Sequence, residues 1–447
     1  MADSSHKAGA QEAQGVAARR AAARALDGVL SERRRLEDGL ESAPGFAAME
    51  ARDRAFARLI AATALRRLGQ IDAALNTFLN REPPAPVMAI LRCGAAELIF
   101  IGAPPHAAVA SNVSVAGADR RTAKMKGLVN AVLRRVAERG AETANGLPPE
   151  SNLPGWLREA WIRAYGAETA RAIAAAGQAE PNLDLTAKTD PQAVAAQTGG
   201  VVLPTGTVRL PGGGRVDALP GFADGSWWVQ DAASAVPARL LNAAPGERVL
   251  DLCAAPGGKA MQLAAAGASV TAVDASEARL KRVRENLART GLSAETVEAD
   301  LLKWAPGEPA DAVLLDAPCT ATGTLRRSPD AAWLRRAGDV AKLAALQARM
   351  LDRAAGWVRP GGRMVYCVCS LQPEEGEAQI AKFLDRQTDF RILPVQDAEL
   401  PGLEAAIRKD GTVRILPSFW PDRGGLDGFF AARLERAPFR SGSNGTA

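Results

Sequence analysis

From residue 248 onward, the chain alternates short apolar runs with segments of helical periodicity. The apolar runs have the length of strands, and they occupy 248–252, 269–273, 296–297, 312–315 and 364–368. The segments 276–290 and 338–358 repeat apolar residues at helical spacing. Strands that alternate with helices in this way predict an α/β domain with a mostly parallel, doubly wound sheet. Ligands of such sheets lie beyond the carboxyl ends of the strands.

The N-terminal third has another pattern. Between residues 17 and 139, apolar residues recur at helical spacing, without the alternation that is typical of strands. Prolines at 83–86 and 104–105 divide this segment into separate helices. We therefore expect an all-α bundle over residues 18–140.

Composition suggests the remaining boundaries. Residues 1–17 are mostly small or polar and are expected to form a disordered tail. A linker is expected at 140–150, which is rich in Gly, Pro and Asn. Residues 151–226 combine one amphipathic helix with short runs broken by Pro and Gly, which indicates a small α+β subdomain. The α/β domain would then occupy 227–437.

Positive charge is concentrated at the N-terminal end. Residues 1–140 contain 21 Lys and Arg against 14 Asp and Glu, although the whole chain has a net charge of only +5. A basic module beside a near-neutral one indicates docking to a polyanion such as RNA, but an ordinary solvated helix surface would give the same composition. The basic residues around the last helix, which are candidates for phosphate contacts, are Arg120, Arg121, Lys124, Lys126, Arg134 and Arg135.

Composition also argues against several classes of protein. Five cysteines in 447 residues form no disulfide framework and suggest the reducing cytoplasm. The only histidines are His6 and His106, so a histidine-based metal centre or a Ser-His-Asp triad is not expected. No apolar run approaches the roughly 18 residues that a membrane-spanning helix needs. We expect neither a metal nor a membrane partner.

Carboxylates stand at the ends of three successive apolar runs. They are Asp251, Asp274 and Asp300, and a carboxylate at such a position can bind ribose hydroxyls or an adenine amino group. Each could instead cap a helix, but three in succession favour a nucleoside ligand. Glycines in the loop after Asp251 let backbone N–H groups approach a ligand at a helix N-terminus. This loop reads Cys253, Ala254, Ala255, Pro256, Gly257, Gly258, Lys259.

Thiols follow the next two strands. Asp316 and Cys319 flank a proline that fixes the direction of their loop, and Cys367 and Cys369 lie two apart on the last strand, where we expect them to face the same side. Cysteine is usually a small buried residue. A nucleotide loop followed by strand-end thiols nevertheless suggests group transfer onto an electrophilic ring, with a cysteine as covalent nucleophile.

Together these segments resemble the Sun (Fmu-type) family of bacterial 16S ribosomal RNA cytosine-5 methyltransferases. The resemblance rests on 251–259, on 316–319 with Gly323, Arg326 and Arg327, and on 366–370, while 416–430 matches the family's C-terminal strand. The N-terminal helices, through 52–56 and 128–134, resemble the NusB-like RNA-binding domain of the ribosomal branch. The resemblance covers about residues 18–437 and implies a Rossmann-like class I methyltransferase domain.

The resemblance implies S-adenosylmethionine as the cofactor. Its methionine end would lie at the loop from Cys253 to Lys259, its ribose at Asp274 and its adenine at Asp300, with Asp316 also close to it. The implied partner is ribosomal RNA, contacted by the basic residues of the bundle, by the subdomain at 151–226 and by Arg326 and Arg327. We expect a cytoplasmic monomer.

The resemblance also implies a mechanism. Cys369 would attack carbon 6 of a cytosine, Asp316 would favour protonation at the ring nitrogen, and Cys319 would assist release of the 5-methylcytosine. The target base must leave its stack, which unpaired RNA allows at low cost. Two residues depart from the family pattern: Cys367 adds a third thiol near the nucleophile, and Ser328 stands where the family often has histidine.

Two other functions remain open at this point. The chain could methylate tRNA instead of ribosomal RNA, although the NusB-like domain disfavours this. It could also be a NusB-like RNA-binding assembly factor with a vestigial catalytic half. The intact set of Asp316, Cys319 and Cys369 argues against that alternative.

Overall fold

The computed structural model describes residues 2–212 and 215–438, with side chains from residue 15 onward. The chain forms two compact units. The first, the helical unit, contains the residues up to Ala179 together with the segment Leu325–Arg336. The second, the sheet unit, contains Glu180–Thr324 and the chain from Ala337 onward. Each unit is described by itself below.

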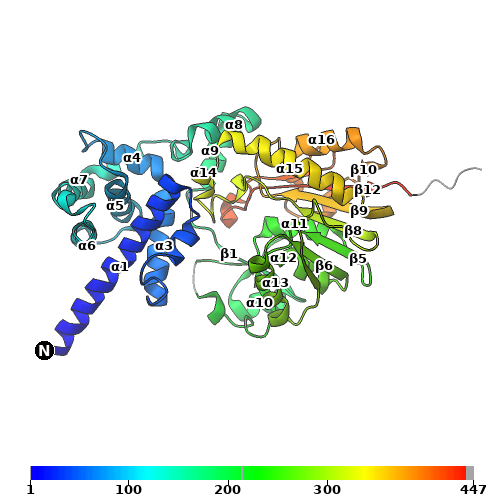
Figure 1. Ribbon diagram of the computed structural model, residues 1–447, viewed down its shortest axis with the longest axis horizontal. Helices are drawn as coiled ribbons and strands as arrows, with labels where there is room; N and C mark the ends of the chain where they lie inside the picture. The colour runs from blue at the N-terminus through cyan, green and yellow to red at the C-terminus, as the bar shows by residue number, and fades with distance from the viewer. Residues whose placement is uncertain (1, 213–214, 439–447) are drawn as a thin grey trace, which may run out of the picture. The chain divides into compact units, whose positions relative to one another are not determined.

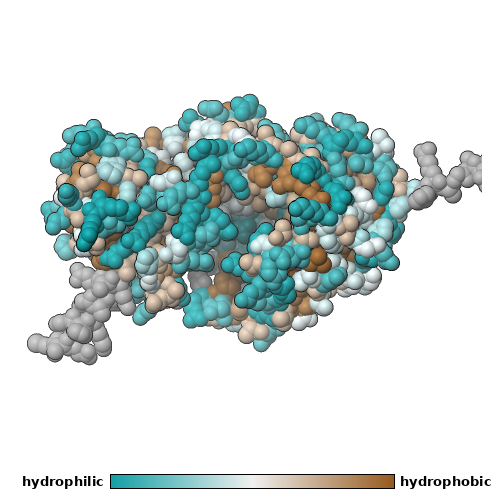
Figure 2. Space-filling view, in the orientation of Figure 1, coloured by the Kyte–Doolittle hydropathy of each residue, from teal (hydrophilic) through white to brown (hydrophobic). Residues whose placement is uncertain are grey.

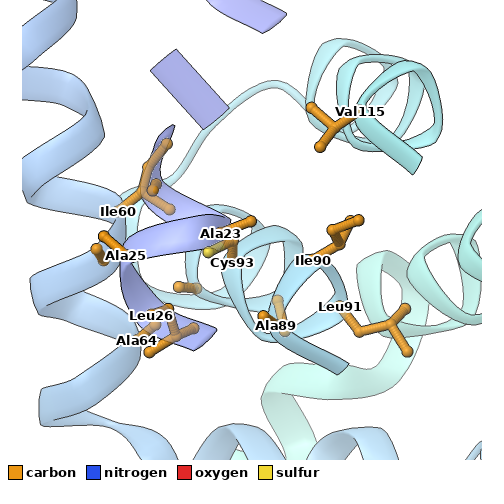
Figure 3. Packing of buried hydrophobic residues seen from close by; sticks show 14 of the residues in the cluster. Ala23, Ala25, Leu26, Ile60, Ala64, Ala89, Ile90, Leu91, Cys93 and Val115 are labelled. Atoms are coloured by element: carbon orange, nitrogen blue, oxygen red, sulfur yellow. The ribbon is translucent and has the colours of Figure 1, made fainter. Parts of the chain in front are cut away.

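The helical unit confirms the all-α bundle. Its helices are α1 (Ala2–Glu32), α2 (Leu36–Glu41), α3 (Ala51–Arg66), α4 (Leu68–Asn76), α5 (Ala85–Ala96), α6 (Pro105–Gly117), α7 (Lys126–Asn145), α8 (Gly155–Tyr165), α9 (Ala167–Ala176) and α14 (Ala331–Leu334). Leu26 of α1, Ile60 of α3 and Leu91 of α5 are fully buried in one core. Figure 3 shows alanines between these larger side chains, and such small residues let the helices pack closely.

Two boundaries of the helical unit differ from those expected. Helix α1 covers the segment expected to be a tail, apart from Met1, which lies outside the described residues. Helix α7 continues to Asn145, so the first half of the expected linker is helical. Gly140 lies inside this helix and packs against Ile99, which a Cβ would approach to 3.2 Å. This glycine allows close packing within the bundle and does not mark a linker.

The main sheet of the sheet unit has eight strands in the described residues. Its order is β10-β12-β9-β8-β5-β6-β7, with β11 paired to β12. The strands are β5 (Arg248–Leu252), β6 (Ser269–Asp274), β7 (Glu295–Glu298), β8 (Ala310–Asp316), β9 (Val358–Val368), β10 (Phe390–Ile392), β11 (Val413–Ile415) and β12 (Phe429–Arg436). Strands β5 to β9 pair in parallel, as expected. Strands β10 to β12 add an antiparallel edge that the sequence analysis missed, except for the match to β12.

Helices cover both faces of this sheet (Figure 1). On one face, α11 (Ala232–Leu241), α12 (Gly258–Ala265) and α13 (Glu277–Thr290) cover Val249 and Leu314. On the other, α15 (Ala337–Ala355) and α16 (Glu377–Arg386) cover Leu250 and Val313. Successive side chains of each strand therefore point into two different cores, which explains why the strands are continuously apolar.

A smaller antiparallel sheet precedes the main one in the chain. It has the order β2-β3-β1-β4, from β1 (Leu183–Ala187), β2 (Val201–Val202), β3 (Val208–Leu210) and β4 (Trp227–Val229). Helix α10 (Pro191–Thr198) packs on it, with Trp227 fully buried beneath. From residue 183 onward this region has the expected α+β character, but α8 and α9, which were expected to belong to the same subdomain at 151–226, lie in the helical unit.

The surface drawn in Figure 2 is mostly hydrophilic, and its hydrophobic patches are small and scattered. Among the described residues, no helix is both long and apolar enough to span a bilayer.

Candidate active site

The carboxyl edge of the main sheet collects the predicted site residues. Asp251 lies in β5, Asp274 and Asp316 end β6 and β8, and Cys369 directly follows β9. Because these strands are parallel neighbours, the side chains meet at one edge. The fold therefore brings together residues that are more than 100 positions apart in the sequence.

The loop after β5 turns sharply into α12. Cys253 and Gly257 have positive φ angles of 62° and 102°, and Gly257 lies against Val283, which a Cβ would approach to 3.2 Å. Ala254 donates its N–H to Val273 at 3.0 Å, which holds the loop against β6. Burial raises the pKa of the Cys253 thiol, so this residue stays neutral. The loop thus places the N-terminus of α12 at the carboxyl edge, and a helix N-terminus favours a polar or anionic ligand.

Asp274 and Asp300 differ in their surroundings. Asp274 is buried and accepts hydrogen bonds from the backbone N–H groups of Ala255 (3.2 Å) and Ser276 (3.1 Å), while Arg279 lies 3.3 Å away. It therefore shapes the loop whatever else it binds. Asp300 follows β7 with a half-exposed side chain that accepts from the N–H of Leu302 at 3.0 Å.

Lys259 is a buried cation at the centre of this edge. Its ammonium group lies 2.7 Å from a carboxylate oxygen of Asp316 and 5.2 Å from the centre of the Phe429 ring. Burial disfavours the charged form, but Asp316, Cys367 and Asp251 together outweigh it and raise the pKa of Lys259. The Cys367 thiol donates to the other oxygen of Asp316 at 3.6 Å. Asp316 is consequently held in one orientation from two sides.

Asp251 lies near the pair of Lys259 and Asp316 and is fully buried. Burial raises the pKa of its carboxyl group to about 7, and the neighbouring charges of Asp316 and Asp274 act in the same direction, while Lys259 opposes them. Three acids, Asp251, Asp274 and Asp316, therefore share this edge of the sheet with Lys259.

The two other thiols lie side by side. The sulfur atoms of Cys319 and Cys369 are 3.5 Å apart. Cys319 is buried, whereas Cys369 is partly exposed. The hydrogen bond with Cys369 and burial both raise the pKa of Cys319 well above its ordinary value. Cys367 is fully buried and donates a hydrogen bond to Asp316, whereas the partner of Cys369 is Cys319.

Glu375 connects the loops that carry these two thiols. Its buried carboxylate accepts hydrogen bonds from the N–H of Thr320 (2.9 Å), from Gln347 (3.0 Å) and from the hydroxyl of Ser370 (2.5 Å). Thr320 follows Cys319 and Ser370 follows Cys369. The sequence analysis missed this role, although Glu375 stands six positions after Cys369.

Glycines bring the same loops into backbone contact. Gly323 donates to the carbonyl of Cys369 at 3.0 Å, and its own carbonyl accepts from Gly428 at 2.8 Å. A Cβ on Gly323 would lie 2.1 Å from the carbonyl oxygen of Gly428, so only glycine fits there. These bonds hold the segments around Gly323, Cys369 and Gly428 in one arrangement.

The residues predicted to contact RNA differ in their exposure. Most of them are exposed on the helical unit: Arg120, Arg121, Lys124, Lys126, Arg134 and Arg327. Arg121 forms an ion pair with Asp119 at 3.0 Å. Arg326 is only 2% exposed, and its carbonyl accepts a hydrogen bond from Arg66 at 2.7 Å. A direct RNA contact by Arg326 is therefore corrected to a structural position within the helical unit.

The parallel sheet, the glycine loop and the acids at its carboxyl edge define a Rossmann-like methyltransferase. The chain belongs to the 16S rRNA methyltransferase RsmB/F family, whose sequence model matches residues 238–435. Residues 16–138 match the model of the NusB family. The resemblance to Sun (Fmu-type) enzymes, the fold class and the cofactor S-adenosylmethionine are confirmed at the level of this family.

Relatives cover nearly the whole chain. "Ribosomal RNA small subunit methyltransferase B" of Xanthomonas campestris is 37% identical and spans 95% of this chain and 98% of its own. The protein of the same name from Klebsiella pneumoniae is 36% identical over 86% of this chain and 90% of its own. The solved structure of PH0851 is similar, with a TM-score of 0.75 and 26% identity over 94% of this chain and 99% of its own.

Proposed function

We propose that the protein transfers a methyl group from S-adenosylmethionine to carbon 5 of a cytosine in small-subunit ribosomal RNA, through a covalent adduct with Cys369. The observation that carries the proposal is the pair of thiols beside the fixed Asp316. The accessible thiol, Cys369, suits a nucleophile, and the buried, protonated thiol of Cys319 suits a group that assists release.

The cofactor fits the residues at the carboxyl edge. The loop from Cys253 to Lys259 leads into the first turn of α12, at Gly258 and Lys259, so that a helix N-terminus faces the edge where acidic side chains end the neighbouring strands. Asp274 and Asp300 are the candidates for the ribose and the adenine. When bound, S-adenosylmethionine supplies the electrophilic methyl group.

The chain's own residues then account for the remaining steps. The Cys369 sulfur bonds to carbon 6 of the flipped base, while Asp316, oriented by Lys259 and Cys367, favours protonation at the ring nitrogen. This would make carbon 5 nucleophilic toward the methyl group that bound S-adenosylmethionine would supply, with the bond from methyl to the sulfonium sulfur breaking to leave S-adenosylhomocysteine. Removal of the carbon 5 proton by a base then expels the Cys369 sulfur and restores the double bond between carbons 5 and 6.

A trapping experiment tests the nucleophile. With RNA that contains 5-fluorocytosine, the carbon 5 proton is replaced by fluorine, so the adduct cannot resolve and a covalent complex should accumulate. We expect trapping by the wild type and by Cys367→Ser, and none by Cys369→Ala. Equal trapping by Cys369→Ala would show that another thiol attacks.

The same assay separates the alternative substrates and functions. Small-subunit rRNA and tRNA transcripts are compared, and the names of the curated relatives favour rRNA. RNA binding without methyl transfer on either substrate would instead support an assembly factor with a vestigial catalytic half. The site geometry argues against that outcome, because Asp316 and both thiols are held in place. A cytoplasmic monomer remains part of the proposal.

A further inference from the structure

A cavity of the sheet unit lies away from the carboxyl edge of the main sheet. It has a volume of about 530 Å³, within the range of roughly 300–1,000 Å³ that is usual for ligand pockets. Its walls are the ends of α11 and α12, the end of β1 and the loop before β3. Helices α11 and α12 lead from there into the starts of β5 and β6. The cavity is therefore at the amino edge of the parallel strands, opposite the thiols.

The charges around this cavity have one sign. Among the residues that line it, Lys188 and Arg239 are cationic and none is acidic. Lys188 donates to the carbonyl of Thr290 at 2.6 Å, which fixes its ammonium group at the wall. Asp190 does not line the cavity, and its carboxylate caps α10 by accepting from the N–H of Gln192 at 2.9 Å. An anion would meet two positive charges here and no opposing carboxylate.

Of the two cations, only Lys188 has a hydrogen-bond partner in the described chain, and Arg239 has none. It is half-buried in the last turn of α11, with its guanidinium against the loop at Gly206, where a Cβ would lie 3.5 Å from it. Within the described residues its side chain forms neither a hydrogen bond nor an ion pair. Burial alone lowers the pKa of Arg239, and no acid counteracts it.

Three more deeply buried arginines of the same unit each have an acidic partner, which Arg239 lacks. Arg209 pairs with Asp184, Arg414 with Glu377, and Arg433 with Glu399, each at 2.6 Å. Withdrawing a guanidinium from water is costly unless an anion compensates it. Arg239 is less deeply buried than these three and has no acid beside it in the described chain, so its guanidinium remains accessible from the cavity to an external anion.

We propose that this cavity binds a phosphate group of the RNA substrate, with the Arg239 guanidinium as its main contact and Lys188 as a second cation. The guanidinium fork matches two phosphate oxygens. The source of the phosphate rests on the proposed function, since that function supplies an RNA. The phosphate chemistry rests on the cavity itself.

The first arm of the test uses inorganic phosphate alone and needs no methyl transfer. Millimolar phosphate should raise the Tm of the wild type above that in chloride of equal ionic strength. The rise should be absent in Arg239→Gln and largely retained in Arg239→Lys. Arg282→Gln removes the same charge from an exposed position of α13 outside the cavity, and should keep the full rise. No phosphate-specific rise in the wild type would overturn the proposal.

The second arm measures the affinity for a small-subunit rRNA transcript at several salt concentrations. Loss of one phosphate contact should reduce the slope of log Kd against log salt by about 0.7–0.9 in Arg239→Gln. An unchanged slope beside a positive first arm would overturn RNA as the source and leave a site for free phosphate. If the wild type binds no RNA, the proposed function fails as well, whereas the first arm still reports on the cavity.

Discussion

Lys259 and Arg239 are both partly or fully buried cations of the sheet unit, but they lie at opposite edges of its parallel strands. At the carboxyl edge, Lys259 is 2.7 Å from Asp316 and close to Asp251. At the amino edge, Arg239 has no acidic neighbour. The first arrangement is complete within the protein and fixes the orientation of a carboxylate, as the proposed reaction requires. The second leaves a cation without an acidic partner, as the proposed phosphate site requires.

The largest effect is expected when the paired cation is removed. Lys259→Met leaves Asp316 without its partner, and breaking a buried pair costs about 3–5 kcal/mol. Because Asp316 retains 28% exposure of its side chain, we expect about 2–3 kcal/mol in the free energy of unfolding, measured in urea. Lys281→Met, at an exposed position of α13, should cost less than about 0.5 kcal/mol. Equal losses would contradict the role assigned to the pair.

The pH dependence of stability tests the buried acid at the same edge. The pKa of Asp251 is about 7 in the folded protein, against about 3.9 when unfolded. Between these values the folded state keeps a proton that the unfolded state loses, so stability decreases as pH rises through this window. Asp251→Asn lacks this loss and should gain about 2–3 kcal/mol relative to wild type between pH 5 and pH 8. A constant difference would refute the raised pKa.

A smaller effect is expected at the link between the thiol loops. Glu375→Gln places an amide donor against groups that already donate to this position, and leaving such donors unsatisfied costs about 1–3 kcal/mol. Methyl transfer should decrease as well, because the two cysteines lose their fixed separation. The adjacent Glu374 is exposed, so Glu374→Gln is the matched control and should resemble the wild type. The same Tm for both variants would remove Glu375 from this role.

The smallest effect is expected at the unpaired cation. Without phosphate, Arg239→Gln breaks no ion pair and should change the free energy of unfolding by less than about 0.5 kcal/mol. Chemical denaturation in a phosphate-free buffer measures this directly. A cost as large as that of Lys259→Met would mean that Arg239 has an internal partner, and the contrast between the two edges would disappear.

The fold was predictable wherever burial is periodic. Strands buried on both faces are continuously apolar, so β5, β6 and β8 were located within two residues at each end. Strands β10 and β11 were missed because three-residue strands at an edge carry too little periodicity to be recognised. Gly140 was misread as linker material because close packing between helices leaves no sign in the local sequence.

The sequence by itself determined the order of strands and helices, and with it the edge at which Asp251, Asp274, Asp316 and Cys369 gather. It also determined the family, because the motifs of that family are local. Only the tertiary structure decided the hydrogen-bond partners of the site residues. Cys367 donates to Asp316, the thiols of Cys319 and Cys369 are in hydrogen-bond contact, and Glu375 accepts from both thiol loops. The reason is that hydrogen bonds and ion pairs depend on contacts between residues far apart in the sequence, such as Lys259 and Asp316, which are 57 positions apart. Local periodicity carries no information about such contacts.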